Sequence, residues 1–405
     1  MLNTNLKRVL GLALLAFTPS ALFAQDIAIH AGELHTVSGT VISNAVVLVQ
    51  GGKITALGKA GEIQIPEGIA RAQAAVVTPG LVDAHTVVGI AGYLNQDGDQ
   101  DQLERSEALQ PELRAIDAYN ARERLVSWVR SFGVTTMHTG HGPGAVISGQ
   151  TMIVKTVGDT VDQAVMVPQA MIAGTLGGES LWGDSKPGTR GKAAAMLREL
   201  LVQGQTYSAK REKGEDGFET NLRLEAVADL LQGKTPLLLT CNRHQDIATA
   251  LRIAREFKLR LVLDGAADAH LLIDQIKAAG VPVVLHPSMR RAQGDAENLS
   301  METAGRLDAA GIPIAIQSGF ESYVPKTRVI LFEAAIAAAH GMPRDRALRS
   351  ITLGAAELLG IAERVGSIDV GKDGDFALYD GDPFEYTSHC VGTIIDGKLV
   401  STKER

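Results

Sequence analysis

The strongest constraint on the fold is a repeated alternation of short apolar runs and helical segments between about residues 77 and 362. Four of the apolar runs end at Thr240, Asp264, His286 and Ser318, and a helical pattern follows each one. Strands that are apolar on both faces and separated by helices form parallel sheets. Over roughly 285 residues, the alternation favours an α/β fold with a closed (β/α)8 TIM barrel. An open doubly wound sheet is the less favoured alternative, because no glycine-rich phosphate loop opens a helix.

Two of the helical segments show their boundaries in the sequence. Segment 246–257 places apolar residues near helical spacing, with Asp246 as its expected N-cap. Segment 268–280 repeats the pattern and is expected to stop at Gly280, since glycine commonly ends helices.

The two ends of the chain differ from this middle part. Short alternating strands fill residues 25–76, with a hairpin signal at Gly51-Gly52. The C-terminal part returns to the same pattern and has another tight turn at Asp396-Gly397. We therefore expect residues 25–76 and 363–405 to pair into one small composite β-sandwich, beside a barrel formed by residues 77–362.

The first 24 residues are predicted to be a secretory signal peptide. Lys7 and Arg8 precede an apolar run, Val9–Phe17, that is too short to span a bilayer, and Ala24 is the expected last residue before cleavage. An uncleaved membrane anchor is the alternative. We expect the mature protein to be exported, into the periplasm.

Charge and cysteine usage exclude several classes of protein. The chain has 405 residues and a formal net charge of −7, with no run of Lys and Arg, so nucleic acid is not an expected partner. No second apolar segment is long enough to cross a membrane once the signal is removed. Two cysteines cannot form a disulfide framework, and Cys241 and Cys390 are expected to be free, buried thiols.

Two polar segments interrupt the alternation. Residues 93–115 are acidic and follow the first barrel strand, and residues 177–218 follow a later one. Loops after barrel strands build the active sites of such folds, so either segment is a candidate substrate lid. A solvated surface loop is the alternative for both.

Several motifs resemble one known family. The run VVTPGLVDAHTVVG at 76–89 resembles the end of the first barrel strand in the amidohydrolase superfamily, and RVGSIDVGKDGDFALYDGDP at 364–383 resembles that family's return into its β-sandwich. Segments 133–155 and 246–269 resemble the imidazolonepropionase-like branch. The resemblance covers nearly the whole mature chain. It implies a TIM barrel of metal-dependent-hydrolase type and hydrolysis of C–N bonds other than peptide bonds.

The resemblance also implies a metal site at the C-terminal mouth of the barrel. In this family the ligands are a His-x-His pair on the first strand, His on the fifth and sixth strands and Asp on the eighth, with a carboxylated Lys on the fourth strand in some members. The metal lowers the pKa of bound water, and the eighth-strand Asp takes its proton during attack on an amide carbonyl.

This chain departs from that ligand pattern. His85 matches the first ligand and is the predicted metal-binding residue. The other positions hold Val87, Thr240, Gly265 and Ser318, and the region of Met171 has no Lys in register. Valine and glycine cannot bind a metal, and hydroxyls are poorer ligands for Zn²⁺ than imidazole or carboxylate. The metal-ligand motifs are therefore degenerate, and the familiar divalent metal, such as Zn, is expected to be lost.

Other residues at strand ends offer replacements. His138, His141 and His286 could together hold Zn²⁺, or each could be a hydrogen-bonded structural residue. For a metal-free reaction, either Ser318 or Cys241 could be a nucleophile activated by His286 or His85, and we predict His286 and Ser318 as the catalytic residues. The alternative is that Ser318 and Cys241 only fill the space of lost ligands. His138, His141 and Arg243 are predicted to contact the substrate.

Two functions stay open at this point. One is a hydrolase acting on the C–N bond of a small cyclic or amide compound. The other is a catalytically inactive amidohydrolase-like pseudoenzyme that binds a ligand or a related hydrolase subunit. The lost ligands favour the second, because uncharged replacements avoid unpaired buried charge. The expected partners are a small-molecule substrate or ligand and a second copy of the chain or a related hydrolase subunit.

Overall fold

The computed structural model describes residues 25–94, 96–183, 186–214, 217–321 and 327–405. The predicted signal peptide, residues 1–24, lies outside the described residues. Within the described ranges, no helix combines the length and the apolar character that spanning a membrane requires.

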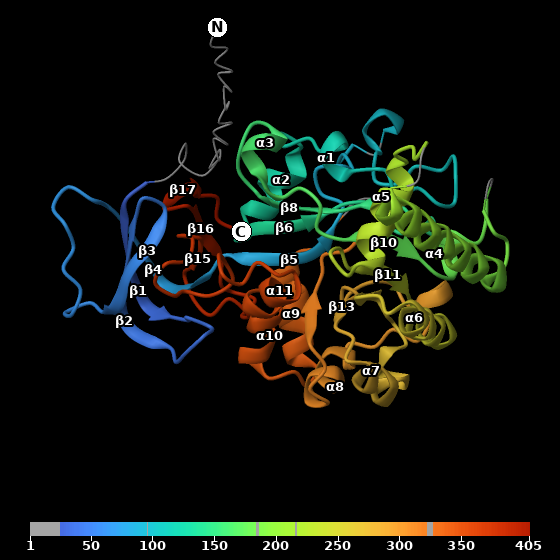
Figure 1. Ribbon diagram of the computed structural model, residues 1–405. Helices are drawn as coiled ribbons and strands as arrows, with labels where there is room; N and C mark the ends of the chain where they lie inside the picture. Colours follow the sequence, from blue (N-terminus) through green and yellow to red (C-terminus); the bar gives the residue numbers. More distant parts are fainter. Residues whose placement is uncertain (1–24, 95, 184–185, 215–216, 322–326) are drawn as a thin grey trace, which may run out of the picture.

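Both ends of the chain contribute to one seven-stranded sheet at one side of the molecule (Figure 1). Its order is β17-β16-β15-β4-β1-β2-β3. The strands are β1 (Ile27–Leu34), β2 (Ile42–Gln50), β3 (Lys53–Lys59), β4 (Ala70–Pro79), β15 (Phe376–Tyr379), β16 (Cys390–Ile395) and β17 (Lys398–Ser401). The N-terminal β4 pairs antiparallel with the C-terminal β15, so the two ends do meet. They form this single sheet, and the facing sheet of a sandwich is not confirmed.

Both expected hairpin turns are present in this sheet. Gly51-Gly52 joins β2 to β3 with φ angles of 57° and 78°. Asp396-Gly397 joins β16 to β17 with φ angles of 50° and 79°. Two successive positive φ values are the geometry of the tight turns that suit the twist of antiparallel strands.

The middle of the chain forms two further sheets. One has the order β14-β13-β12-β11-β10-β7, and the other has the order β5-β6-β8-β9. The strands are β5 (Leu81–Thr86), β6 (Val134–Thr139), β7 (Gly149–Gln150), β8 (Met152–Lys155), β9 (Val165–Val167), β10 (Ile172–Thr175), β11 (Leu237–Cys241), β12 (Leu261–Gly265), β13 (Val283–Leu285) and β14 (Ile314–Ile316). From β10 to β14 the pairing is parallel throughout. The predicted strand ends lie within two residues of those observed.

The expected closed eight-stranded barrel is not formed by the ladders of the described residues. The two sheets of the middle part are joined by a bridge between Thr86 and Gly319. At the other side, β8 turns back antiparallel to β6, and β7 pairs antiparallel with β10. The cause is the loop 140–148, which replaces the helix of a regular β/α unit and sends the chain back beside β6.

Helices lie around the two sheets of the middle part (Figure 1). They are α1 (Ala115–Ala118), α2 (Arg124–Arg130), α3 (Val161–Ala164), α4 (Arg190–Lys213), α5 (Leu222–Leu231), α6 (His244–Phe257), α7 (Ile273–Ala279), α8 (Thr303–Ala309), α9 (Ile330–Ala339), α10 (Arg344–Ser350) and α11 (Leu353–Leu358). Helix α7 ends at Gly280, as predicted. The predicted N-cap of α6 is wrong: the cap is Arg243, and Asp246 lies in the first turn with its carboxylate 2.9 Å from Nε of Arg190.

Successive residues of the buried strands face opposite sides. Leu237 and Leu239 of β11 pack into the core shared with the helices. Leu238 instead joins an inner cluster with Val262 of β12 and Val284 of β13. This two-sided burial explains why the strands are apolar at every position. Cys241 and Cys390 are free and buried, as predicted.

The two polar segments have different places. The first, residues 93–115, packs against the loop 140–150, where Gln102 O accepts the Gly142 N–H at 2.7 Å and Gln110 N–H binds Ile147 O. The second, residues 177–218, contains a 3-10 turn, Gly178–Ser180, at the carboxyl end of β10. Only the second segment lines the cavity described next.

Candidate functional site

The centre of the candidate site is an ion pair between two strand ends. His85 lies near the end of β5 and Asp264 near the end of β12, and the Nδ1 and Oδ1 atoms are 3.0 Å apart. Both side chains are buried. Burial lowers the pKa of His85, but the charge of Asp264 and the hydrogen bond to it outweigh burial, so the pKa is raised.

Asp264 also accepts hydrogen bonds from two residues at the carboxyl ends of other strands, β11 and β14. Thr240 Oγ1 donates to Oδ2 at 2.5 Å, and Gln317 Nε2 donates to Oδ1 at 2.8 Å. Burial raises the pKa of Asp264, whereas His85 and these two donors lower it, and the net result is a lowered pKa. The carboxylate is therefore held ionised by partners from three different segments.

Asp83 lies on the same face of β5, two residues before His85. Its Oδ1 accepts the Ser318 N–H at 3.0 Å, and its Oδ2 is buried without a hydrogen-bond partner among the described residues. Burial raises the pKa of Asp83 to about 6, although the hydrogen bonds with Ser318 oppose this. Ser318 Oγ accepts a hydrogen bond from Thr327 Oγ1 at 2.7 Å.

Two adjoining cavities lie at this end of the strands. The inner one has a volume of about 20 Å³ and is lined by His85, Asp264 and Gln317, among others. Such a volume holds about one water molecule. The outer cavity measures about 500 Å³, which is within the range of small-molecule sites. Thr240 and Arg290 line both, so the inner recess opens toward the outer pocket.

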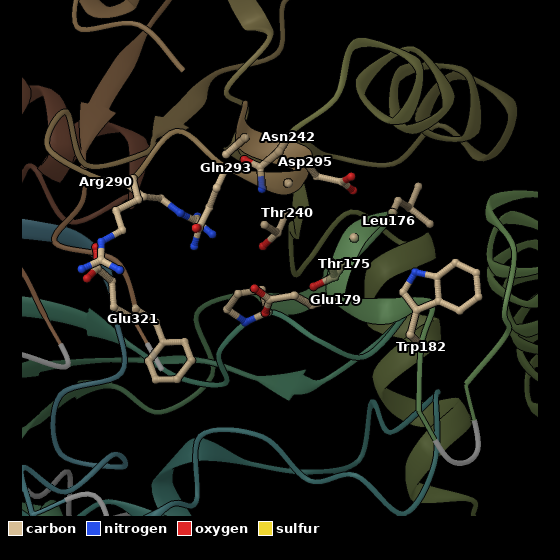
Figure 2. A pocket seen from close by; sticks show the side chains of 17 residues that line it. Thr175, Leu176, Glu179, Trp182, Thr240, Asn242, Arg290, Gln293, Asp295 and Glu321 are labelled. Carbon is tan, nitrogen blue, oxygen red and sulfur yellow. The ribbon is translucent and has the colours of Figure 1, made fainter. Parts of the chain in front are cut away.

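The outer pocket is built from loops that follow the parallel strands. Figure 2 shows Arg290 at one side and Trp182 at the other, with Thr175, Thr240 and Glu179 between them. Its lining combines carboxylates, guanidinium groups, threonine hydroxyls and one exposed indole. This mixture suits a polar small molecule.

Comparisons with known proteins agree with this architecture. The model of the "Amidohydrolase family" matches residues 327–401. The imidazolonepropionase of Porphyromonas gingivalis is 24% identical, with 92% of each chain covered. An amidohydrolase from Thermotoga maritima has a similar structure, with a TM-score of 0.87, 26% identity and coverage of 93% of this chain and 100% of that one. The chain is thus similar to members of the amidohydrolase superfamily. Within it, the similarity is to the imidazolonepropionase-like branch.

A fungal member of the superfamily is also similar. Amidohydrolase tasK of Hapsidospora irregularis is 25% identical over 87% of this chain. The chain spans only 39% of that protein, in contrast to its near-complete match with the imidazolonepropionase.

The positions that hold metal ligands in the superfamily carry residues here that are packed or hydrogen-bonded within the protein. Val87 is buried, and Met171 belongs to the inner apolar cluster. Thr240 donates its hydroxyl to Asp264. Gly265 has a φ of 73°, and a Cβ at this position would lie 2.7 Å from Asn242 Oδ1. A histidine at Gly265 would therefore require the backbone or its neighbour to move.

The residues at the mouth do not fit the superfamily's metal centre. Among the described residues, one group of at least three His, Cys, Asp or Glu side chains brings its ligand atoms within 4.8 Å of one another: Asp380, His389 and Glu404. This group lies beside the seven-stranded sheet and is largely exposed. His85 Nε2 has no partner among the described residues, but Asp264 already accepts three hydrogen bonds.

Of the other predicted histidines, His138 lies beside His85, with 5.6 Å between the ring centroids, but its nitrogens are already bound. His138 uses both ring nitrogens, with Nδ1 2.7 Å from Ala84 O and Nε2 2.6 Å from Thr151 Oγ1. Burial lowers its pKa to about 3, so the ring is a neutral structural group. The relocated zinc site is therefore not formed, and the structural alternative holds for His138.

His141 and His286 are also buried and neutral. Burial lowers the pKa of each to about 4. His286 Nδ1 lies 2.9 Å from Pro287 O, while both ring nitrogens of His141 lack partners among the described residues. Neither ring lines the two cavities at the mouth.

The predicted pair of Ser318 and His286 is not joined by a hydrogen bond among the described residues, because Ser318 contacts Thr327 and Asp83 instead. Their catalytic role stays a prediction. Arg243 does not line the pocket, but its Nε binds Oδ1 of the lining residue Asp295 at 2.8 Å. Arg243 thus positions a wall of the pocket.

Sequence reasoning missed three pocket residues: Glu179, Trp182 and Arg290. The first two fall in the polar segment 177–218, which was a candidate lid, so a signal for them was present. Arg290 follows a strand end by only a few residues. Its position after His286 was the available signal, because loops at that end of the strands form the site.

Proposed function

We propose that this protein binds a small compound with an amide-type C–N bond in the 500 Å³ pocket, and that it does so without the superfamily's metal centre. The single observation that carries the proposal is that protein donors already occupy both oxygens of the Asp264 carboxylate. His85, Thr240 and Gln317 all direct hydrogen bonds to it. The ion pair with His85 compensates the buried charge without a metal ion.

A hydrolase acting on C–N bonds other than peptide bonds is the second candidate. It is supported by the superfamily relationship and by His85 Nε2, which is buried and unpartnered among the described residues. In this alternative the inner recess of about 20 Å³ takes the reacting water, and Asp83, with a pKa of about 6, is a group able to exchange a proton near neutral pH.

Elemental analysis of the purified mature protein separates the two. We expect less than stoichiometric Zn, Fe or Mn, an unchanged Tm after chelation, and saturable binding of at least one member of an amide panel with no hydrolysis. The control is His389→Ala, which dismantles the exposed group with Asp380 and Glu404 and so removes adventitious metal. Stoichiometric metal that survives His389→Ala but is lost in His85→Ala, together with turnover, would establish the hydrolase instead.

We also propose export to the periplasm and self-association or pairing with a related hydrolase subunit. The first 24 residues and the family resemblance support these proposals. Fractionation of cells that produce the full chain tests the compartment. Light scattering of the mature protein, alone and mixed with a related hydrolase, tests the assembly.

A further inference from the structure

The outer pocket contains two charged side chains that the protein itself leaves unpaired. Most charges around it are internally compensated: Asp295 binds Arg190 and Arg243, and Glu321 binds Arg328 at 2.6 Å. By contrast, the side chains of Glu179 and Arg290 have no hydrogen bond or ion pair within the part of the chain that the structure describes.

The surroundings of Glu179 do not neutralise it by direct contact. The nearby Lys186 ammonium is bound to the backbone carbonyls of Gly144 and Glu179 rather than to the carboxylate. Trp182 follows three residues later and is 71% exposed, although it lines the pocket. Both residues favour an organic cation in the pocket, Glu179 through its negative charge and Trp182 because the indole face attracts positive charge.

Arg290 lies across the pocket from Trp182 (Figure 2). A guanidinium presents paired donors that match a carboxylate. Its backbone is fixed, because its N–H binds Pro287 O at 3.1 Å and the preceding Met289 N–H binds the buried carboxylate of Glu333 at 2.9 Å. The backbone that carries the Arg290 side chain is thus held in place.

We propose that the pocket recognises a zwitterion with separated charges: an ammonium group at Glu179 and Trp182, and a carboxylate at Arg290. This rests on the proposed function and names the class of its ligand. We place the two charges at opposite ends of the compound rather than on one carbon atom, because Arg290 lies at one side of the pocket and Trp182 at the other (Figure 2).

Calorimetry with four matched compounds tests the proposal. The probes are β-alanyl-β-alanine, its N-acetyl derivative, its C-terminal amide and the doubly blocked form, which carry both charges, the negative one, the positive one and neither. We expect the zwitterion to bind most tightly, with each blocked end weakening binding roughly fivefold to tenfold. Arg290→Gln should weaken only compounds with a free carboxylate, and Glu179→Gln only those with a free amine.

Exposed residues elsewhere provide the controls. Arg252→Gln and Glu199→Gln remove the same charges from α6 and α4, away from the pocket, and should leave all four affinities unchanged. Fluorescence locates the binding site, because the chain has two tryptophans and the other, Trp128, packs against Phe132 outside the pocket. Trp182→Phe should abolish the ligand-dependent signal.

The outcomes distinguish this inference from the proposed function. Two results would overturn the zwitterion while leaving an amide-binding pocket intact. One is equal binding of the blocked and unblocked compounds, and the other is an Arg290→Gln variant that weakens binding equally with and without a free carboxylate. Binding of none of the four compounds overturns the zwitterion. Failure of the wider amide panel as well overturns the proposed function.

Discussion

His85 on β5 and Asp264 on β12 form a buried ion pair, with 3.0 Å between Nδ1 and Oδ1. Each partner shifts the other toward its charged form, since the pKa of His85 is raised and that of Asp264 is lowered. The contribution of His85 is complete below about pH 6.5 and is lost as the pH rises through its folded pKa. The contribution of Asp264 is present above about pH 3.9 and is lost as the pH falls through its folded pKa.

Removing one partner of this pair should therefore be strongly destabilising. We expect His85→Ala to lower the free energy of unfolding by about 3–5 kcal/mol at pH 5.5, because it leaves a buried carboxylate without its cation. Urea unfolding measures the change. The double variant His85→Ala/Asp264→Asn should recover part of the loss, and a double variant less stable than the single one would contradict this explanation.

The identity of the strands was accessible from sequence because burial on both faces leaves a local signature. Leu237, Leu238 and Leu239 alternate between two cores, so the run has to be apolar at every position. Closure of the barrel was not accessible in this way. It depends on the loop 140–148 and on the antiparallel return of β8, which no apolar pattern encodes.

The positions of site residues at strand ends were predictable from the sequence, whereas the hydrogen bonds between those residues were not. The apolar pattern predicted a strand end at Asp264, and β12 ends one residue later, but the hydrogen bonds of Asp264 with Thr240 and Gln317 arise from residues far apart in the chain. His138 lies near the end of β6, as predicted, yet both of its ring nitrogens are bound, to Ala84 and Thr151. Which of several buried histidines is available is decided by contacts between distant segments.

Gly265 should resist substitution because two separate effects act on it. Its φ of 73° disfavours any side chain, and a Cβ would lie 2.7 Å from Asn242 Oδ1. We expect Gly265→Ala to lower the free energy of unfolding by about 2–3 kcal/mol. Gly280→Ala is the matched control, since its φ is 63° and nothing lies within 4 Å of the added Cβ. A loss of only about 1 kcal/mol is expected there, and equal losses at both sites would rule out the steric contribution.

Lys155 joins β8 to the seven-stranded sheet through three carboxylates. Its Nζ lies 2.9 Å from Asp373 and 3.2 Å from Asp375, and it also contacts Asp396. We expect Lys155→Met to lower the free energy of unfolding by about 3–5 kcal/mol at pH 7.5, since three buried carboxylates lose their shared cation. Lys53→Met is the control: Lys53 also binds Asp373, but its side chain is 49% exposed, so a loss below about 1 kcal/mol is expected.

The loss in Lys155→Met should depend on pH in a defined direction. Burial raises the pKa of Asp375 to about 6, although Lys155 opposes this. Protonation of Asp375 is therefore favoured in the folded state, and the stability it contributes is complete below about pH 3.9 and lost as the pH rises through 6. We expect the destabilisation by Lys155→Met to be smaller at pH 5 than at pH 7.5. Thermal unfolding at the two pH values checks this, and a larger loss at pH 5 would contradict it.

Glu333 on α9 binds the loop that carries Arg290, and its protonation state should affect the stability of the protein. Oε2 accepts the Met289 N–H at 2.9 Å, whereas Oε1 is buried without a partner among the described residues. Burial raises the pKa of Glu333 to about 7, although the bond from Met289 and the charge of Arg328 lower it and Glu321 reinforces the rise. The protonated form therefore contributes stability that is complete below about pH 4.3 and is lost as the pH rises through 7.

A glutamine at this position keeps the acceptor for Met289 but cannot titrate. We expect the stability of the natural protein to fall by roughly 2–3 kcal/mol more than that of Glu333→Gln between pH 5 and pH 8.5. Urea unfolding across this range provides the comparison, with the exposed Glu199→Gln as the control that keeps the natural pH dependence. Hydrogen exchange at the Met289 amide should be faster in Glu333→Ala than in Glu333→Gln, because alanine offers no acceptor. Parallel pH profiles for the natural protein and Glu333→Gln would show that the carboxyl group titrates outside this range, and that the loop carrying Arg290 is held by other contacts.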